Sequence, residues 1–203
     1  MATLLKKSDN FRLNVNLQDL HFNRDCFKSF DIESVDRETF FNFVFCSPVE
    51  SIDASHYGVK FSEIKAINKS NHDVFFNEVL KEMNIESVNL FKVFDSEPDK
   101  NGKVKERCNL KEKLIKDDTS FLYLYTGGAR CEISLFLSIR NALAHGNIFR
   151  YDGYYYLYSV SNKNAMTVDE FERKITFLMK IIDISLLKKG WDVLLKYMII
   201  RED

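Results

Sequence analysis

Apolar residues recur along most of the chain with the 3.6-residue period of an amphipathic α-helix. Their spacing predicts helices over five segments, which are 33–48, 72–94, 110–128, 129–146 and 167–203. These assignments favour a mostly α fold, a bundle of about five helices.

Capping residues and helix breakers refine these predicted helices. Ser34 or Asp36 can cap the first helix, and Pro48 would stop it. A break is expected near Asn84. The last segment opens with Thr167 and Glu170, a capping box, and Gly190 should kink or split it.

One stretch departs from the helical period. Asp152-Gly153 stands between two arms rich in β-branched and aromatic residues, which predicts a β-hairpin directly after the helix of 129–146. We therefore expect one domain over 1–203, with this hairpin inserted into the bundle, an N-terminal arm at 1–30 and a flexible loop at 95–109.

Composition and charge narrow the class of protein. With 203 residues, 45% of them hydrophobic, the chain can bury one substantial core. The net charge of -1 does not indicate a nucleic-acid-binding protein, so contact with RNA or DNA would need a local patch. No run of about 20 apolar residues is present, and the cysteines form no C-x-x-C pair. We expect a soluble cytoplasmic protein with no membrane partner.

The helix of 129–146 is apolar nearly all round, which predicts burial. One narrow polar stripe interrupts it, formed by Ser134, Ser138, Asn141 and His145. Unsatisfied buried polar groups are costly, so this stripe must face a cleft, an interface or internal partners.

Arg140 and His145 carry the candidate chemistry of this helix. On an ideal helix they lie about 140° apart, so a shared phosphate would require both the reach of the arginine side chain and local unwinding at His145, which Gly146 permits. A second copy of the helix, packed across a two-fold axis, would help further. The residues alone leave a structural interpretation open. A histidine at a helix C-terminus is favoured by the macrodipole, and Arg140 could pair with a carboxylate.

The string "SIRNALAHG", 138–146, resembles the signature of the HEPN superfamily, an Arg followed after four to six residues by His, often with Asn directly after the Arg. The resemblance implies a HEPN-like dimeric α-bundle and a metal-independent endoribonuclease of a toxin–antitoxin or antiviral-defence system. It implies that Arg140 and His145 are catalytic and that Asn141 supports them. Asn147 stands where some members carry a tyrosine that a partner enzyme modifies.

These residue types suit metal-free RNA cleavage, in which the 2′-OH attacks the adjacent phosphate and leaves 2′,3′-cyclic phosphate and 5′-OH ends. Histidine can move protons near neutral pH, and arginine offers a permanently charged fork to the phosphate. No metal or other cofactor is expected. The expected partners are RNA, a second copy through the helix of 129–146, and an antitoxin or defence-system protein. The alternatives are a catalytically silent module that binds RNA or protein, and a purely structural helical protein.

Further residues are candidates for supporting roles. Ser138 belongs to the polar stripe, and Glu132 could orient the site through a salt bridge. Arg150, Tyr151 and Tyr154 follow the motif and could contact RNA, the tyrosines by stacking on unpaired bases. In the hairpin, Tyr154, Tyr156 and Tyr158 should point to one face, and Tyr155 and Leu157 to the other. The competing interpretation is that these tyrosines fix the hairpin to the bundle.

Overall fold

The fold was analysed in a computed structural model of the 203-residue chain. It describes residues 35–48, 60–93, 118–126, 129–151, 153–160 and 175–199. The predicted N-terminal arm and the predicted loop at 95–109 lie outside these residues, as does the capping box at Thr167.

Four α-helices occur in the described residues: α3 (Arg37–Phe41), α4 (His72–Glu82), α7 (Cys131–Ala144) and α9 (Leu186–Ile199). A π-helical segment, η2 (Asn42–Cys46), continues directly from α3, and two 3₁₀ turns, η3 (Phe61–Glu63) and η4 (Ser87–Asn89), flank α4.

A five-stranded mixed sheet accompanies the helices, with spatial order β1-β2-β5-β4-β3. Its strands are β1 (Leu90–Val93), β2 (Phe121–Tyr125), β3 (Ile148–Tyr151), β4 (Tyr154–Val160) and β5 (Ile175–Ile181). Only β1 and β2 pair in parallel, and the other three pairings are antiparallel.

The fold is therefore mixed α/β, and the predicted mostly α bundle of about five helices with one inserted hairpin is wrong. Three stretches interpreted as helix are strands in the structure: β1, β2 and β5. The predicted hairpin after the motif helix is confirmed, because β3 and β4 pair across a two-residue connection. Instead of an insertion in a bundle, the hairpin forms the β4–β3 edge of the sheet.

Two of the misassigned strands, β2 and β5, are buried on both faces. In β2 the first four residues are all buried, and in β5 every residue from Phe177 to Ile181 is buried. A strand that is covered on both sides has no alternation of apolar and polar residues, so its short apolar run has the same pattern as a buried helix.

Other local predictions were right. Asp36 caps α3, accepting a hydrogen bond from the backbone N–H of Thr39 at 2.9 Å. The break near Asn84 is confirmed, since α4 ends at Glu82 and Asn84 has a left-handed φ of 58°.

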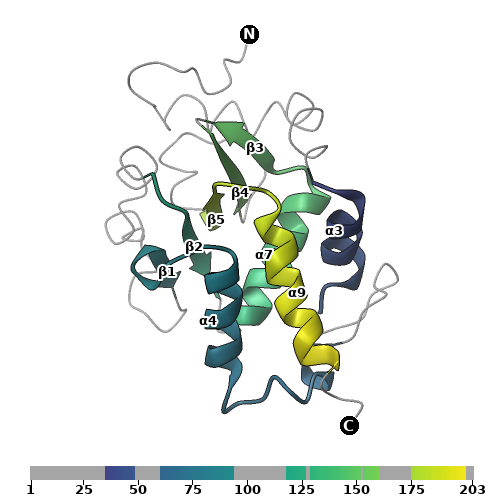
Figure 1. The fold of residues 1–203 in the computed structure, drawn as a ribbon. Coiled ribbons are helices and arrows are strands. Elements are labelled where there is room, and N and C mark those ends of the chain that lie inside the picture. Colours follow the sequence, from purple (N-terminus) through teal and green to yellow (C-terminus); the bar gives the residue numbers. More distant parts are fainter. Residues whose placement is uncertain are drawn as a thin grey trace.

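α7 is the central helix of the molecule. It lies between the sheet and the outer helices α4 and α9, packing on β2 and β4 on one side and on α4 and η2 on the other (Figure 1). The ring of Phe136 contacts four aromatic residues from four other elements, which are Phe43, Phe61, Phe75 and Trp191. This aromatic cluster fixes α7 in place.

Gly190 does not kink or split α9, which runs unbroken through it. A Cβ at this position would collide with the side chain of Met83, whose Cγ would lie only 3.0 Å away. A larger residue here would therefore displace the Met83 side chain where α9 crosses the end of α4.

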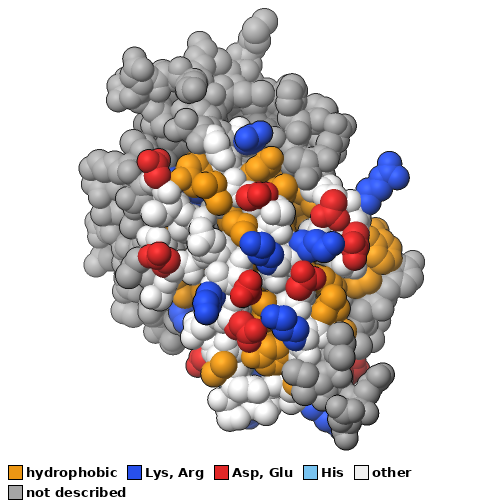
Figure 2. Space-filling model, in the orientation of Figure 1, with side chains coloured by type: hydrophobic (Ala, Val, Ile, Leu, Met, Phe, Trp, Pro, Cys, Tyr) orange, Lys and Arg blue, Asp and Glu red, His pale blue; other side chains and the backbone are white. Residues whose placement is uncertain are grey.

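The face of the molecule that carries α4 and α9 shows acidic and basic side chains in alternation (Figure 2). Ion pairs of Lys188 with Glu38 (3.3 Å) and of Lys196 with Glu78 (3.8 Å) link α9 to its neighbours there. No field of one sign dominates this view, so it is not the local basic patch that RNA binding would need. Among the described helices, none is both long and apolar enough to cross a membrane.

Candidate functional site at the end of the central helix

The polar stripe of α7 changes in exposure along its length. Ser134 is buried, and its hydroxyl lies 3.4 Å from the carbonyl of Thr126. Ser138, Asn141 and His145 are half-buried, and the neighbouring Leu137 is 39% exposed. The second half of α7 therefore presents an accessible face, whereas its first half is enclosed.

The helix ends in a Schellman motif. Gly146 adopts a left-handed φ of 64°, its N–H donates to the carbonyl of Leu143, and the N–H of Asn147 donates to that of Ala142 at 2.8 Å. His145 is the C-cap residue, still in the right-handed helical region, and its N–H donates to the carbonyl of Asn141. The chain is thus helical up to His145 and turns away only at Gly146.

This geometry excludes one of the expected ways to bring the motif residues together. Because the backbone is not unwound at His145, the angle of about 140° between Arg140 and His145 around the helix axis applies. A site that used both side chains on one phosphate would need the reach of the arginine or a second copy of α7.

Arg140 is oriented by the π-helix. Its Nε donates to the carbonyl oxygen of Val44 in η2 at 3.2 Å, and its Nη1 lies 3.5 Å from Oδ1 of Asn141. π-Helical segments occur preferentially at functional sites. Residues 96 positions apart are thus joined, a contact for which the sequence carries no local signal.

Glu132 does not join this group. It lies in the first turn of α7, eight residues before Arg140 and so about 12 Å away along the helix axis. Its carboxylate is fully buried, with Arg130 Nε at 2.9 Å and His72 Nδ1 at 4.0 Å. The geometry of neither contact is that of a hydrogen bond. Glu132 therefore pairs with the positive charge of Arg130 where α7 begins, and it does not orient Arg140.

The hairpin residues occupy different environments. Arg150 is exposed, and its guanidinium lies 5.3 Å from the ring centroid of Tyr155. Tyr154 is half-buried against Lys180, whose Nζ lies 4.1 Å from its ring centroid. Tyr151 belongs to β3, and its side chain is outside the described part of the structure.

The predicted alternation along β4 is confirmed. Leu157 and Tyr155 pack toward the core formed with the helices, while Tyr156 and Tyr158 are buried on the opposite face of the sheet. These two tyrosines are only 2% and 3% exposed, so they fix the hairpin in the fold and cannot stack on RNA bases.

The described residues do not indicate a nucleophilic cysteine or a metal-binding site. Burial raises the pKa of the Cys131 thiol, and burial also raises that of Cys46, so both remain protonated near neutral pH and are poor nucleophiles. Within the described ranges, no three His, Cys, Asp or Glu side chains gather closely enough to hold a metal ion.

The sequence matches no protein-family model, and comparisons with curated proteins and with solved structures also gave no match.

Sequence reasoning missed the residues that reach the motif from elsewhere in the chain, above all Val44. It also missed the contact between His72 and Glu132, because both contacts arise only when distant segments pack.

Proposed function

We propose that the protein is a metal-independent endoribonuclease of the HEPN type, acting as a toxin or defence effector. The observation that carries the proposal is the set of Arg140, Asn141 and His145 on the accessible end of an otherwise buried helix, with Arg140 oriented by the Val44 carbonyl. These three side chains lie where a ligand could reach the helix, whereas the residues of α7 before Leu137 are enclosed.

The roles follow from the chemistry of each side chain. His145 would transfer the proton between the attacking 2′-OH and the leaving 5′-oxygen, since imidazole titrates near neutral pH. Arg140 would stabilise the negative charge that develops on the phosphate. Asn141 would help to hold the guanidinium plane.

The expected five-helix fold is not present, so the resemblance to the HEPN superfamily rests on the string 138–146 alone. This favours keeping a second candidate function, a module that binds RNA or protein without cleavage. The contact of Arg140 with the Val44 carbonyl also fits that candidate, because the arginine then ties α7 to η2 as a structural residue.

Purified wild-type protein, Arg140→Ala and His145→Ala should be incubated with a broad panel of RNAs in EDTA. The proposal predicts cleavage by wild type with 2′,3′-cyclic phosphate ends. Each substitution should lower the rate by about 10²- to 10⁴-fold, the usual loss when a proton-transfer or charge-stabilising group is removed.

Arg37→Ala serves as the matched control, since Arg37 is an exposed arginine of the adjacent helix α3, and it should cleave like wild type. Circular dichroism and thermal unfolding should show that all variants are folded. If wild type binds RNA but releases no cyclic-phosphate ends, the non-catalytic module is the correct function.

A further inference from the structure

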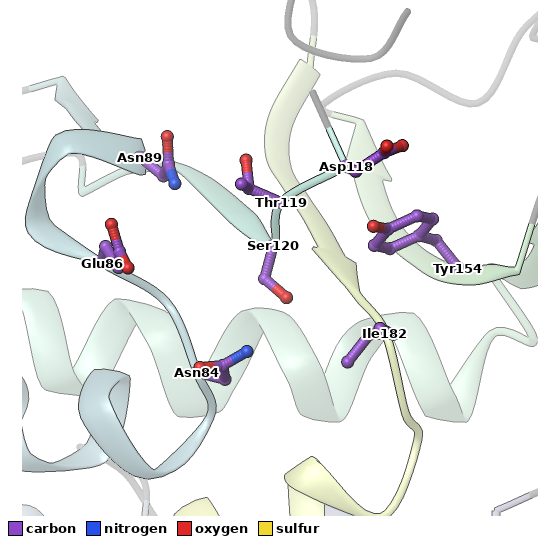
Figure 3. A pocket seen from close by; sticks show the side chains of 8 residues that line it. All are labelled: Asn84, Glu86, Asn89, Asp118, Thr119, Ser120, Tyr154 and Ile182. Carbon is purple, nitrogen blue, oxygen red and sulfur yellow. The ribbon is translucent and has the colours of Figure 1, made fainter. Parts of the chain in front are cut away.

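A small polar cavity lies apart from the motif, beside the start of β2. It has a volume of about 100 Å³. Its described lining residues come from four separate parts of the chain: Asn84, Glu86 and Asn89, then Asp118, Thr119 and Ser120, then Tyr154, and finally Ile182. Figure 3 shows these side chains arranged around the N-terminal end of β2, with Glu86 and Asp118 on opposite sides of Ser120.

Ser120 is the main indication that the cavity takes a ligand. Its side chain is only 4% exposed, and its hydroxyl has no hydrogen-bond partner in the structure. In Figure 3 the hydroxyl points into the space between Asn84 and Ile182. Because buried polar groups are nearly always hydrogen-bonded, an unsatisfied hydroxyl that faces a cavity indicates a group that binds there.

The charge of the lining side chains indicates which kind of chemical group would bind in the cavity. Two carboxylates, of Glu86 and Asp118, stand at the cavity, and none of the lining residues that the structure describes is a Lys, Arg or His. Seven of the eight lining side chains carry hydrogen-bonding oxygen atoms. Lys180 is close by, but its Nζ lies against the ring of Tyr154 and outside the lining. A ligand that donates several hydrogen bonds and carries positive charge complements such a site.

The volume of the cavity indicates how large the bound group can be. A volume of about 100 Å³ exceeds the share of about 30 Å³ that one water molecule occupies in the liquid, so a group of several non-hydrogen atoms fits. Asn84 and Glu86 also line a second, more open hollow of about 600 Å³, which continues along the end of α4. The cavity and this second hollow are therefore neighbours that share Asn84 and Glu86.

We propose that this cavity binds the guanidinium or ammonium group of a small organic cation, with the rest of the ligand lying along the end of α4. Ser120 accepts one hydrogen bond from the cationic group, and Glu86 and Asp118 supply the charge complementarity. Nothing in this proposal depends on the ribonuclease activity.

The test is a titration of the full chain, followed by ¹⁵N NMR, with methylguanidinium and with methylurea, which have nearly the same shape but differ in charge. We expect methylguanidinium to bind with a Kd on the order of 1 mM, a reasonable value for so small a ligand, and to shift the amides of residues 84–89 and 118–120. Methylurea should bind at least tenfold more weakly. Equal affinities of the two would overturn the assignment of charge, and no shift at these amides would overturn the site.

Variants locate the site and have matched controls. Ser120→Ala and the pair Glu86→Gln/Asp118→Asn should each weaken methylguanidinium binding at least fivefold. Ser47→Ala removes another buried hydroxyl without a partner, and Glu82→Gln removes an exposed carboxylate outside the lining, so both should bind like wild type. If the controls weaken binding as much as the site variants, the proposal fails.

A further comparison distinguishes a free small molecule from an arginine side chain of another protein. Agmatine presents the guanidinium on a free chain, whereas N-acetyl-arginine amide presents it beside a peptide backbone. We expect agmatine to bind at least as tightly as methylguanidinium. Tighter binding of N-acetyl-arginine amide than of agmatine would contradict a small-molecule ligand.

Discussion

At the scale of single residues, the motif depends on groups that are distant in the sequence. Arg140 is oriented by a backbone carbonyl in η2, and η2 follows directly from α3. The start of α3 is in turn capped by Asp36, which accepts hydrogen bonds from the hydroxyl and the backbone N–H of Thr39. A short chain of contacts therefore connects one exposed aspartate with the arginine of the motif.

The cap should show a defined dependence on pH. The hydroxyl of Thr39, followed by its backbone N–H, lowers the pKa of Asp36 below the usual value of 3.8. A carboxylate with a lowered folded-state pKa stabilises the protein above its unfolded-state pKa, and this stabilisation is lost as the pH falls through the folded-state value.

Asp36→Ala should therefore lower the free energy of unfolding by about 1 kcal/mol at pH 7, the typical value of an N-cap. The difference from wild type should shrink as the pH falls below 3.8. Urea unfolding at several pH values measures it. A difference that is the same at pH 7 and at pH 2.5 would contradict a role for the ionised carboxylate.

At the scale of elements, packing decides where the helices lie. α9 crosses α4 at Gly190, where the absence of a Cβ leaves room for the buried side chain of Met83. Alanine would gain about 1 kcal/mol of intrinsic helix propensity over glycine, but overpacking a core costs about 1 to 3 kcal/mol. The cost of overpacking should outweigh the gain.

Gly190→Ala should thus destabilise the protein by about 1 kcal/mol in the wild-type background. In the background of Met83→Ala, which removes the colliding atoms, the same substitution should be neutral or stabilising. Thermal or urea unfolding of the four proteins in this double-mutant cycle measures the coupling. Additive effects would show that the close contact between α9 and Met83 has no energetic consequence.

At the scale of the whole molecule, α7 is enclosed by the sheet, α4 and η2 except along the accessible face that carries Leu137, Asn141 and His145. If that face joins two copies of the chain, Arg140 of one copy can act with His145 of the other. Such a site is consistent with the angle between the two residues on one helix.

A mixing experiment tests this arrangement. Equal amounts of Arg140→Ala and His145→Ala, inactive alone, should regain about a quarter of wild-type ribonuclease activity after exchange of subunits. Half of the dimers are then mixed, and each mixed dimer has one intact site of two. No recovery, despite verified exchange, would mean that each site is built within one chain.

The sequence by itself determined the features that depend on neighbouring residues. The helix of α7, its end at Gly146, the Asp36 cap, the end of α4 near Asn84 and the hairpin at Gly153 were all predicted. Each arises from helical periodicity, a capping side chain or a glycine that permits a left-handed φ, and these act over a few residues.

Only the tertiary structure decided the fold class and the environment of the motif. β2 and β5 form the middle of the sheet and are covered on both faces, so their apolar runs carry no period that separates strand from helix. One local signal was present in the sequence, the aspartate at position 183. Its carboxylate accepts a hydrogen bond from the backbone N–H of Ser185, within the turn that separates β5 from α9. Val44 contacts Arg140 and His72 contacts Glu132, and both lie far from their partners in the sequence. Packing between distant segments, and not local spacing, brings these pairs together.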